Sequence, residues 1–403
     1  MRILFVNEKG AFFGGVEQHI AHAARELTAR GHECQLAFLN ADGRDAAGFQ
    51  SIFTDTRQLP AMAGAPADSG SQRWLAQSWC DLRFDVVYFH KLPQLPDLRA
   101  LPPHVRTVQM VHDHDLCCPR KHKYFAVSGR VCAQPAGWRC YLDAAFVARD
   151  RQQPLGVRLQ SISSHLREMR RHWTLDSLLV GSRWMRDELL MNGAPADRIA
   201  IVPPAVPSGG AAPSGVPDGN LVLYVGQLIR GKGVDRLLEA VARLEQPCRV
   251  VLAGQGNHEG VLRRLAQRLG IADRVDFSGW VAPADIGALY RAATVVAVPS
   301  RWPEPFGMVG LEAMHHARPV VGFDVGGIRD WLDDGRNGRL VPDGDIAAFA
   351  GALGELLGKP GRARRMGLNG RLALDTRFSF PACIDTLETH LCGSRSTDIR
   401  RTA

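Results

Sequence analysis

The sequence of 403 residues lacks any apolar run that approaches the roughly 20 residues a membrane-spanning helix needs. It also lacks a recognisable signal peptide, because Met1-Arg-Ile-Leu-Phe-Val passes straight into a loop. We therefore expect a cytoplasmic protein, for which any membrane contact would be peripheral, on the inner face of the membrane. A single hydrophobic core rarely serves more than about 250–300 residues, so the length predicts two domains.

The sequence also lacks the concentrated charge of a nucleic-acid-binding protein. Its net charge is +8, from 49 Lys and Arg against 41 Asp and Glu. The parts before and after Pro207 are similarly basic, with 25 basic against 20 acidic residues through Pro207 and 24 against 21 after it. Because the charge is spread in this way, we expect no nucleic-acid partner.

The nine cysteines lack the paired C-x2-C spacing of a strong zinc motif, and a cytoplasmic location argues against disulfides. The segment 113–142 could still supply tetrahedral zinc ligands. It contains Cys117, Cys118, Cys132, Cys140, His114 and His122. Buried or loosely paired thiols are the default interpretation, and structural zinc on Cys118, Cys132 and Cys140 is the weaker alternative.

The first glycine-rich loop lacks the G-x-G-x-x-G spacing, which disfavours a nicotinamide cofactor. It reads Gly10-Ala-Phe-Phe-Gly-Gly15, between a predicted strand at 2–7 and a helix that runs through Arg30. Paired glycines at a helix start present backbone N–H groups to a phosphate. Gly14 and Gly15 are therefore candidate phosphate-binding residues, unless they only permit close packing there.

What the sequence does contain is a regular alternation of strands and helices, typical of doubly wound α/β domains. We predict a first Rossmann-like domain over 1–205, with a basic, cysteine-containing insertion at 113–142. A Pro/Gly/Ser-rich linker follows at 206–219. A second Rossmann-like domain occupies 220–377, and 378–403 form a helix that crosses back to the first domain, and a tail.

Two consecutive strand–loop–helix units in the second domain carry the candidate chemistry. An apolar strand at 294–298 enters a Pro/Gly loop that contains Glu304. A helix begins near Phe306, with Glu312 roughly two turns into it. The next strand ends in Asp324-Val-Gly-Gly327, where N–H groups could face an anion. Open α/β sheets bind ligands at the carboxyl ends of their strands, and carboxylates with helix N-termini suit a ligand that is both polyol and phosphate: a nucleotide-sugar.

The pair Glu304 and Glu312, with Phe306-Gly307 between them, resembles the E-x7-E signature of the family 4 retaining glycosyltransferases. Flanking segments match as well: Val298-Pro-Ser, Glu312-Ala-Met, Pro319-Val-Val and Gly326-Gly327. The resemblance covers both domains and is densest over 221–345. It implies the GT-B fold, in which two Rossmann-like domains face a central cleft and the donor lies mainly on the second.

The resemblance also implies roles for residues of the second domain. Glu312 would accept hydrogen bonds from the donor's ribose, and Glu304 would address the sugar ring. Gly254 and Val281 match the edge that binds the base. In the first domain, Gly14 and Gly15 would lie against the donor's phosphate and sugar.

The departing phosphate would be stabilised by cations and backbone N–H groups. Lys232 and Arg230 would supply the cations, and Phe306, Gly307 and Met308 the N–H groups. The family usually has an arginine directly after the first glycine of this loop, where this sequence has Gln227. Arg230 would then supply the guanidinium from a neighbouring turn, which makes Lys232 the firmer prediction.

Two histidines end predicted strands of the first domain, at His90 and His112. Related enzymes commonly have a histidine at such a strand end, where it contacts or supports the donor sugar. We favour His112, which Asp113 follows, as the catalytic histidine, with His90 as the donor-binding alternative. Asp113 and Asp115 form an Asp-x-Asp that binds a cation in a different glycosyltransferase fold, and the two Rossmann-like domains contradict that fold.

A predicted helix over 155–173 has apolar residues at helical spacing, with arginines largely between them. An ordinary amphipathic helix is one interpretation, and an interfacial helix against anionic lipid is the other. The basic insertion at 113–142 would lie over the acceptor side.

The predicted reaction moves a hexosyl group from a nucleotide-diphosphate sugar to a hydroxyl of a glycan, glycolipid or small molecule. By the resemblance, configuration is retained, the leaving phosphate takes the acceptor's proton, and no metal or other cofactor is required. Bacterial cell-envelope glycan or glycolipid assembly is the favoured role. The alternatives are a soluble natural-product acceptor, a nucleotide-sugar phosphorylase or epimerase of the same fold, and a non-catalytic sensor.

Overall fold

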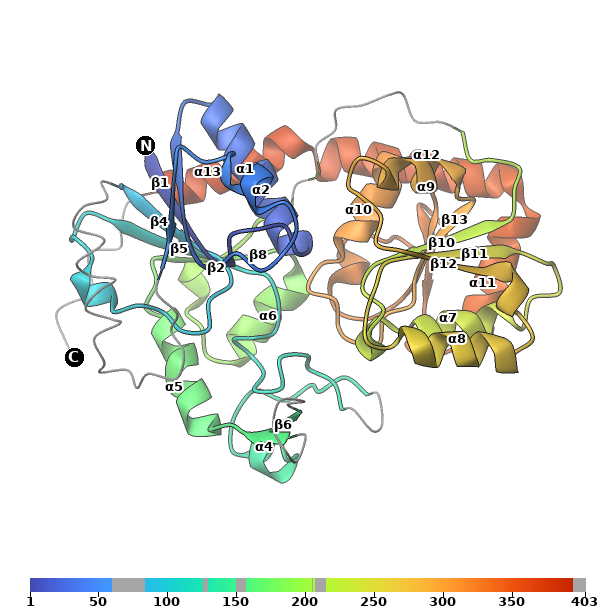
Figure 1. Ribbon diagram of the computed structural model, residues 1–403, viewed down its shortest axis with the longest axis horizontal. Coiled ribbons are helices and arrows are strands. Elements are labelled where there is room, and N and C mark those ends of the chain that lie inside the picture. Colours follow the sequence, from blue (N-terminus) through green and yellow to red (C-terminus); the bar gives the residue numbers. More distant parts are fainter. Residues whose placement is uncertain (60–83, 126–129, 150–156, 205, 207–214, 394–403) are drawn as a thin grey trace. The chain divides into compact units, whose positions relative to one another are not determined.

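The computed structural model describes residues 1–59, 84–125, 130–149, 157–204, 206 and 215–393. The chain divides into two compact units (Figure 1). Unit 1 comprises 1–121, 134–205 and 381–403, and unit 2 comprises 122–133 and 206–380.

Unit 1 is built on a parallel sheet of seven strands in the order β3-β2-β1-β4-β5-β8-β9. The strands are β1 (Arg2–Lys9), β2 (Glu33–Asn40), β3 (Asp55–Gln58), β4 (Val86–Phe89), β5 (Arg106–Val111), β8 (Ser177–Val180) and β9 (Ile199–Ile201). The central strands β4 and β8 are buried at every residue, which is why they read as short continuous apolar runs.

Helices cover both faces of this sheet. They are α1 (Gly15–Ala29), α2 (Ala46–Gln50), α5 (Ile162–His172), α6 (Arg183–Met191) and α13 (Phe380–Cys392). Figure 1 shows α1 and α13 on one side of the sheet and α5 and α6 on the other. Short 3-10 turns lie at Leu98–Ala100 and Ala196–Arg198.

Unit 2 is built on a parallel sheet of six strands in the order β12-β11-β10-β13-β14-β15. The strands are β10 (Leu221–Val225), β11 (Arg249–Ala253), β12 (Val275–Gly279), β13 (Val295–Val298), β14 (Val320–Phe323) and β15 (Gly338–Val341). The helices are α7 (Val234–Val241), α8 (Glu259–Arg268), α9 (Ile286–Ala292), α10 (Met308–His315), α11 (Ile346–Gly358) and α12 (Pro360–Arg377). Figure 1 shows α10 and α12 on one face of the sheet, with α7 and α8 on the opposite face.

The core of unit 2 contains polar groups whose hydrogen bonds are satisfied by backbone. Arg318 is fully buried, and its guanidinium donates to the carbonyls of Tyr290 and Arg291 at 2.7 and 2.8 Å. Trp331 is also fully buried, and its indole N–H donates to the carbonyl of Phe306 at 2.6 Å. Turns of 3-10 helix at Arg230–Lys232, Ala272–Arg274 and Gly327–Asp330 complete the unit.

The predicted helix over 155–173 is wrong in its first part. Residues Val157–Leu159 form β7, which pairs antiparallel with β6 (Val147–Arg149), and α5 begins only at Ile162. The short helix α4 (Arg139–Leu142) precedes this ribbon. The apolar face of α5 packs inward, since Ile162 and Met169 are buried, so α5 is an ordinary amphipathic helix.

The predicted insertion at 113–142 does not stay with one domain. Residues 122–133 belong to unit 2, whereas the flanking parts belong to unit 1. Tyr124 is buried there, and its ring lies about 3.5 Å from where a side chain on Gly231 would begin. Most of the predicted linker, 207–214, lies outside the described residues. No helix in the described part of the chain is long and apolar enough to cross a membrane.

Candidate active site

The loops that follow strands β10, β11, β13 and β14 meet at the carboxyl edge of the unit 2 sheet. Gly226 directly follows β10 and Gly254 directly follows β11. A Cβ on Gly254 would stand 1.8 Å from the Gly226 carbonyl oxygen. Glu304 and Gly326 form a parallel bridge between the loops after β13 and β14. The glycines therefore let neighbouring backbones touch, which gathers the predicted residues on one rim.

Glu304 lies at the centre of this rim and is only 5% exposed. Its Oε1 accepts hydrogen bonds from Lys232 Nζ at 2.7 Å and from the Ser300 hydroxyl at 2.5 Å. Burial by itself would raise the pKa of Glu304, but the adjacent Lys232 ammonium and the hydrogen bonds hold that pKa below its ordinary value. Glu304 is therefore an ionised carboxylate at neutral pH.

Lys232 is positioned by a tight turn after β10. Its ammonium lies 4.9 Å from the centroid of the Trp302 ring, close enough for a cation–π interaction. Gly231, the residue before it, is buried between Tyr124 and Trp302. Gly233 follows in the left-handed conformation at φ +66°, where a Cβ would meet the Pro299 carbonyl. Arg230 is exposed at the start of the same turn.

The helix α10 begins at Met308, with Gly307 as its N-cap residue at φ +91°. The N–H groups of Met308 and Val309, at the start of the helix, can bind an anion, whereas that of Gly310 donates to the Gly307 carbonyl at 3.0 Å. Phe306 serves a structural role besides: its ring is buried and its carbonyl accepts the Trp331 indole N–H.

Glu312 lies on α10 and is partly exposed. Its Oε2 accepts a hydrogen bond from the Tyr290 hydroxyl at 2.6 Å. Burial raises the pKa of Glu312, and this effect outweighs the opposing hydrogen bond from Tyr290. Glu312 and Glu304 thus differ in environment: Glu304 accepts a hydrogen bond from a cation, whereas Glu312 accepts one from a neutral phenol.

The turn 324–327 serves the site differently from the prediction. The Gly327 N–H donates to the Glu304 carbonyl at 2.7 Å, so it fixes the Glu304 loop and does not point to an anion. Asp324 forms an ion pair with Arg329.

The predicted base-binding residues also lie on this rim. Gly254 follows β11, and its N–H donates to the Gly279 carbonyl at 2.7 Å. Val281 follows β12 and is a partly buried residue packed against the unit 2 core.

In unit 1, the Gly14–Gly15 pair opens α1 as predicted. The Gly14 N–H, however, donates to the carboxylate of Glu17 at 2.9 Å. The same carboxylate accepts from the Asn7 side chain at 3.2 Å. Glu17 is therefore the capping partner of Gly14. Of the two predicted glycines, Gly15 is the one whose N–H can bind a ligand at the helix start.

His90 and His112 follow β4 and β5, and the structure brings their rings together. His90 Nδ1 lies 2.9 Å from His112 Nε2, and the two rings are stacked with centroids 5.2 Å apart. A third ring, His19 of α1, packs edge-on against both. Burial, and then the neighbouring histidines, hold the pKa of His90 and of His112 well below the ordinary value, and lower that of His19 to about 4. The cluster is therefore neutral at neutral pH.

Next to this cluster, Asp113 and Asp115 share a cation that the protein itself supplies. Lys91 Nζ lies 2.5 Å from Asp113 and 3.2 Å from Asp115. Burial would raise the pKa of both carboxyls, yet Lys91 holds the pKa of Asp113 below its ordinary value, while burial and Asp113 raise that of Asp115. Lys91 therefore supplies the positive charge between the two carboxyls, and the absence of a metal there stays a prediction.

The cysteines of 113–142 are divided between the units. Cys118 and Cys140 belong to unit 1, and Cys132 belongs to unit 2. Within the described ranges, no group of three or more Cys, His, Asp or Glu is arranged to hold a metal ion. Structural zinc stays a weak prediction that elemental analysis would test.

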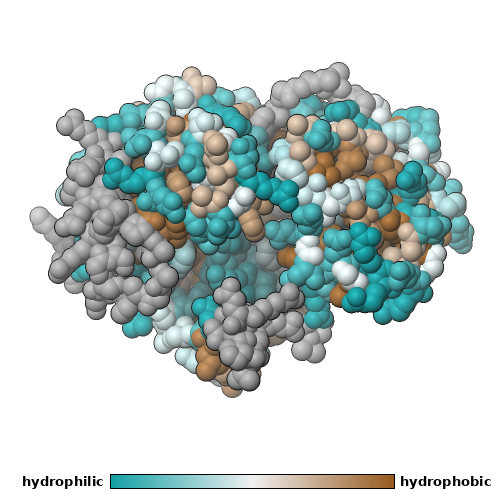
Figure 2. All heavy atoms as spheres, viewed as in Figure 1, coloured by the Kyte–Doolittle hydropathy of each residue, from teal (hydrophilic) through white to brown (hydrophobic). Residues whose placement is uncertain are grey.

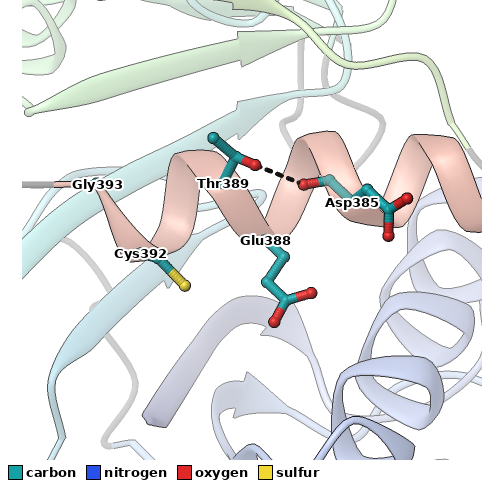
Figure 3. Close-up of a pocket in the computed structure, with 5 residues that line it drawn as sticks. All are labelled: Asp385, Glu388, Thr389, Cys392 and Gly393. Atoms are coloured by element: carbon teal, nitrogen blue, oxygen red, sulfur yellow. Dashed lines mark hydrogen bonds between the residues drawn. The ribbon is translucent and has the colours of Figure 1, made fainter.

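One pocket of unit 1 lies along α13 and is lined by Asp385, Glu388, Thr389, Cys392 and Gly393 (Figure 3). Its carboxylates already have partners. Arg30 donates to Asp385 at 2.6 Å and to Glu388 at 2.8 Å, and His32 Nε2 lies 2.7 Å from Glu388. These contacts attach α13 to the start of unit 1, so the pocket belongs to helix docking and not to the candidate site.

The residues that hold the predicted site residues in place were not predicted from the sequence. The most important are Ser300 beside Glu304, Trp302 and Tyr124 beside the Lys232 turn, Tyr290 beside Glu312, and His19 beside His112. Ser300 lies four residues before Glu304 in the same loop, so the sequence alone could have predicted their contact. The others come from distant segments, and no spacing pattern links them.

Two family models match this chain, one over each predicted domain. A model described as Glycosyltransferase Family 4 matches residues 13–208. A model described as Glycosyl transferases group 1 matches residues 212–373.

Curated relatives match over about half of the chain. The D-inositol 3-phosphate glycosyltransferase of Acidothermus cellulolyticus is 36% identical over 231 residues, which cover 51% of this chain and 51% of that protein. The alpha-D-kanosaminyltransferase of Streptomyces kanamyceticus is 34% identical over 176 residues, or 43% of this chain and 45% of that protein. The chain thus spans about half the length of the curated relatives it matches.

Solved structures match over nearly the whole chain. Anabaena HepE in complex with UDP has a TM-score of 0.73 at 19% identity and covers 97% of this chain and 99% of its own. Sucrose-phosphate synthase from Thermosynechococcus elongatus has a TM-score of 0.73 at 21% identity, with coverage of 96% and 97%. At such low identity these likenesses show the fold.

Proposed function

Since this chain belongs to the GT-B glycosyltransferases of family 4, whose models match both of its units, we propose that it transfers a hexosyl group from a nucleotide-diphosphate sugar to a hydroxyl acceptor. The observation that carries this proposal is the Glu304–Lys232 pair. A buried carboxylate and an ammonium 2.7 Å apart stand on the rim where α10 begins, with Glu312 further along that helix. This arrangement offers a partner for each part of a nucleotide-sugar.

In the proposed complex, Glu312 accepts hydrogen bonds from the ribose and Glu304 from the sugar ring. Lys232, Arg230 and the N–H groups at the start of α10 lie on the diphosphate. The crystal structures of HepE were obtained with UDP and with UDP-glucose, which supports a nucleotide-sugar donor here.

The proposed chemistry is a same-face substitution with retention. The bond between the anomeric carbon and the β-phosphate oxygen breaks while the acceptor oxygen bonds to that carbon. The acceptor's proton passes to the departing phosphate, so the products are the nucleoside diphosphate and the glycoside. Glu304 keeps its charge through its contact with Lys232, and it stabilises the positive charge that grows on the sugar ring.

His112 is proposed as a further catalytic residue that contacts the donor sugar. Its neutral ring can donate or accept a hydrogen bond at the nitrogen that His90 leaves available. His90 is almost fully buried and bonded to His112. We therefore assign His90 the supporting role, in place of a direct donor contact.

The acceptor is a second part of the proposal. We favour a glycan or glycolipid of the bacterial cell envelope, and a soluble natural product is the alternative. One curated relative is named for D-inositol 3-phosphate and another for the transfer of a kanosaminyl group.

A donor screen tests the proposal most directly. Thermal-shift measurements across UDP-, GDP-, dTDP- and ADP-sugars should show stabilisation by one nucleotide class, since ligands that bind the folded state raise its melting temperature. Turnover without a sugar acceptor would instead favour a phosphorylase or epimerase. An inverted anomeric configuration in the product, read by NMR, would contradict retention.

Lys232→Ala tests the role of the cation in bond cleavage. Negative charge on the leaving phosphate grows in the transition state, so this variant should lower kcat as well as raise KM, by about 10²-fold or more in kcat/KM. Excess EDTA should leave the wild-type rate nearly unchanged. Strict dependence on Mg²⁺ or Mn²⁺, with a normal kcat in Lys232→Ala, would show that a metal handles the leaving group.

A further inference from the structure

Exposed apolar side chains gather in two segments of unit 1, residues 138–147 and 157–159, here together called the apolar tip. Among the described residues, it holds six of the twelve large hydrophobic residues that are exposed. Leu142 is 76% exposed, Leu159 74% and Trp138 68%. Tyr141, Val147 and Val157 complete the set. A concentration of this kind marks an interaction surface, whereas single exposed apolar residues do not.

The apolar tip is a built surface and not a loose loop. Val147 pairs with Leu159 across the β6–β7 ribbon, and strand alternation places Val147, Val157 and Leu159 on one face. Trp138 and Leu142 are four residues apart along α4, so they share a side of it. The rings of Tyr141 and Phe146 pack with centroids 6.4 Å apart, which joins α4 to the ribbon.

Gln160 fixes the tip to the rest of unit 1. Its side-chain amide donates to the carbonyls of Ala145 and Pro119, both at 2.7 Å. Figure 1 shows α4 and β6 at the end of α5, away from the seven-stranded sheet, and Figure 2 shows hydrophobic residues on the surface there.

Exposed arginines occur in the tip and in the helix α5 that follows it. Arg139, Arg158, Arg167 and Arg170 are all exposed. The Arg139 guanidinium lies 5.5 Å from the Trp138 ring. Arg158 projects from the opposite face of the ribbon to Leu159, because neighbours on a strand alternate.

We propose that the apolar tip docks this protein on an anionic lipid surface. Tryptophan and tyrosine favour the boundary between headgroups and acyl chains, leucine enters the acyl region, and arginine binds the lipid phosphates. The surface differs from the one the sequence predicted, because the apolar face of α5 is buried in unit 1 and the exposed residues precede that helix. The inference is independent of the proposed reaction.

Vesicle sedimentation tests this proposal. The wild-type protein should bind phosphatidylcholine vesicles that contain phosphatidylglycerol, and added salt should weaken the binding. Leu142→Ser/Leu159→Ser should lower partitioning at least tenfold, and Arg139→Ser roughly fivefold at low salt. Leu368→Ser/Leu372→Ser is the matched control, since these two residues are 58% and 57% exposed on α12 of unit 2 and should bind like the wild type.

Two results would overturn the proposal. The first is equal vesicle binding by the tip variant and the control. The second is a wild-type protein that ignores every vesicle but forms a dimer which Leu142→Ser/Leu159→Ser separates in size-exclusion chromatography, since the tip would then be an interface between copies. Nucleotide binding should be the same in all variants, which separates failure of this proposal from failure of the proposed function.

Discussion

At the scale of single residues, two carboxylates on one rim have opposite environments. Glu304 is ion-paired with Lys232, whereas the partly exposed Glu312 accepts a hydrogen bond from the Tyr290 phenol. We expect the ribose hydroxyls to complete the partners of Glu312. The two residues should therefore respond to substitution in different assays.

Glu312→Ala should weaken binding of the nucleoside diphosphate itself, because it removes a partner of the ribose and not of the sugar. A lost charge-assisted hydrogen bond costs about 1.5–3 kcal/mol, which is roughly a ten- to hundredfold loss of affinity. Isothermal titration calorimetry measures the nucleotide affinity. Tyr290→Phe is the smaller change at this site, because it removes only the hydroxyl that donates to Glu312. Unchanged nucleotide affinity in a folded Glu312→Ala protein would refute the assignment.

Glu304 should make stability depend on acidity. The pKa of Glu304 is lowered in the folded state. Its contribution to the free energy of unfolding is therefore fully present above the ordinary pKa of 4.5 and is lost as the pH falls through the lowered pKa. Glu304→Gln should unfold more easily at pH 7, by about 1.5–3 kcal/mol for a charge-assisted bond, and the difference from wild type should shrink in acid. Urea unfolding at both pH values measures this, with the exposed Glu245→Gln as the control.

At the scale of elements, the strands of both sheets could be predicted well from the sequence. The predicted strand at 2–7 lies within β1, and the one at 294–298 differs from β13 by one residue. Parallel strands buried on both faces are short continuous apolar runs, and turn residues bound them, so local sequence is enough.

Non-local contacts explain what could not be predicted. Leu159 continues the helical spacing of α5, yet it pairs with Val147 in an antiparallel ribbon that no local pattern reveals. In the site, Lys232 and Glu304 are 72 residues apart, so their ion pair depends on the order of β10 and β13 in the sheet. The resemblance identified both residues but assigned them to separate parts of the donor.

The bridge between the loops after β13 and β14 gives a prediction for an element. Gly326 has φ +61°, and a Cβ there would stand 2.3 Å from the Glu304 carbonyl oxygen. Gly326→Ala should therefore displace the Glu304 loop and lower both stability and activity. Gly335→Ala is the matched control, because Gly335 has φ +73° with no atom within 4 Å of the added Cβ. The control should lose only about 1–2 kcal/mol, the cost of a left-handed residue.

Equal loss of stability and activity in the two alanine variants would contradict this account. Differential scanning fluorimetry and steady-state kinetics on both proteins supply the comparison.

At the scale of the whole molecule, α13 follows unit 2 in sequence but packs in unit 1. Its Ile384, Leu387 and Leu391 are buried, and Arg106 donates to the His390 carbonyl at 2.8 Å. Arg30, and then His32, lower the pKa of Glu388, so Glu388 stays ionised at neutral pH and keeps its ion pair with Arg30. The stability of unit 1 should thus depend on the last helix of the chain.

Leu387→Ala should lower the free energy of unfolding of unit 1 by about 2–5 kcal/mol, the usual cost of removing a buried leucine side chain. Hydrogen exchange followed by mass spectrometry should show faster exchange in β1 and β2 and unchanged exchange in β10 and β11. Thr386→Ala is the control, because Thr386 is exposed on the same helix. Faster exchange in unit 2 alone would be the contrary result.

The course of the chain between the two units has a consequence for exchanging parts among related enzymes. The chain leaves unit 1 at residue 121, returns at 134, leaves again at 205 and returns at 381. A chimaera with one junction in the linker would therefore join unit 2 to a foreign copy of 122–133, including the Tyr124 that packs on Gly231. It would also give unit 1 a foreign α13, without the partners of Arg30. A functional graft of unit 2 needs three junctions besides the one in the linker, and recombination at a single point is expected to yield poorly folded hybrids.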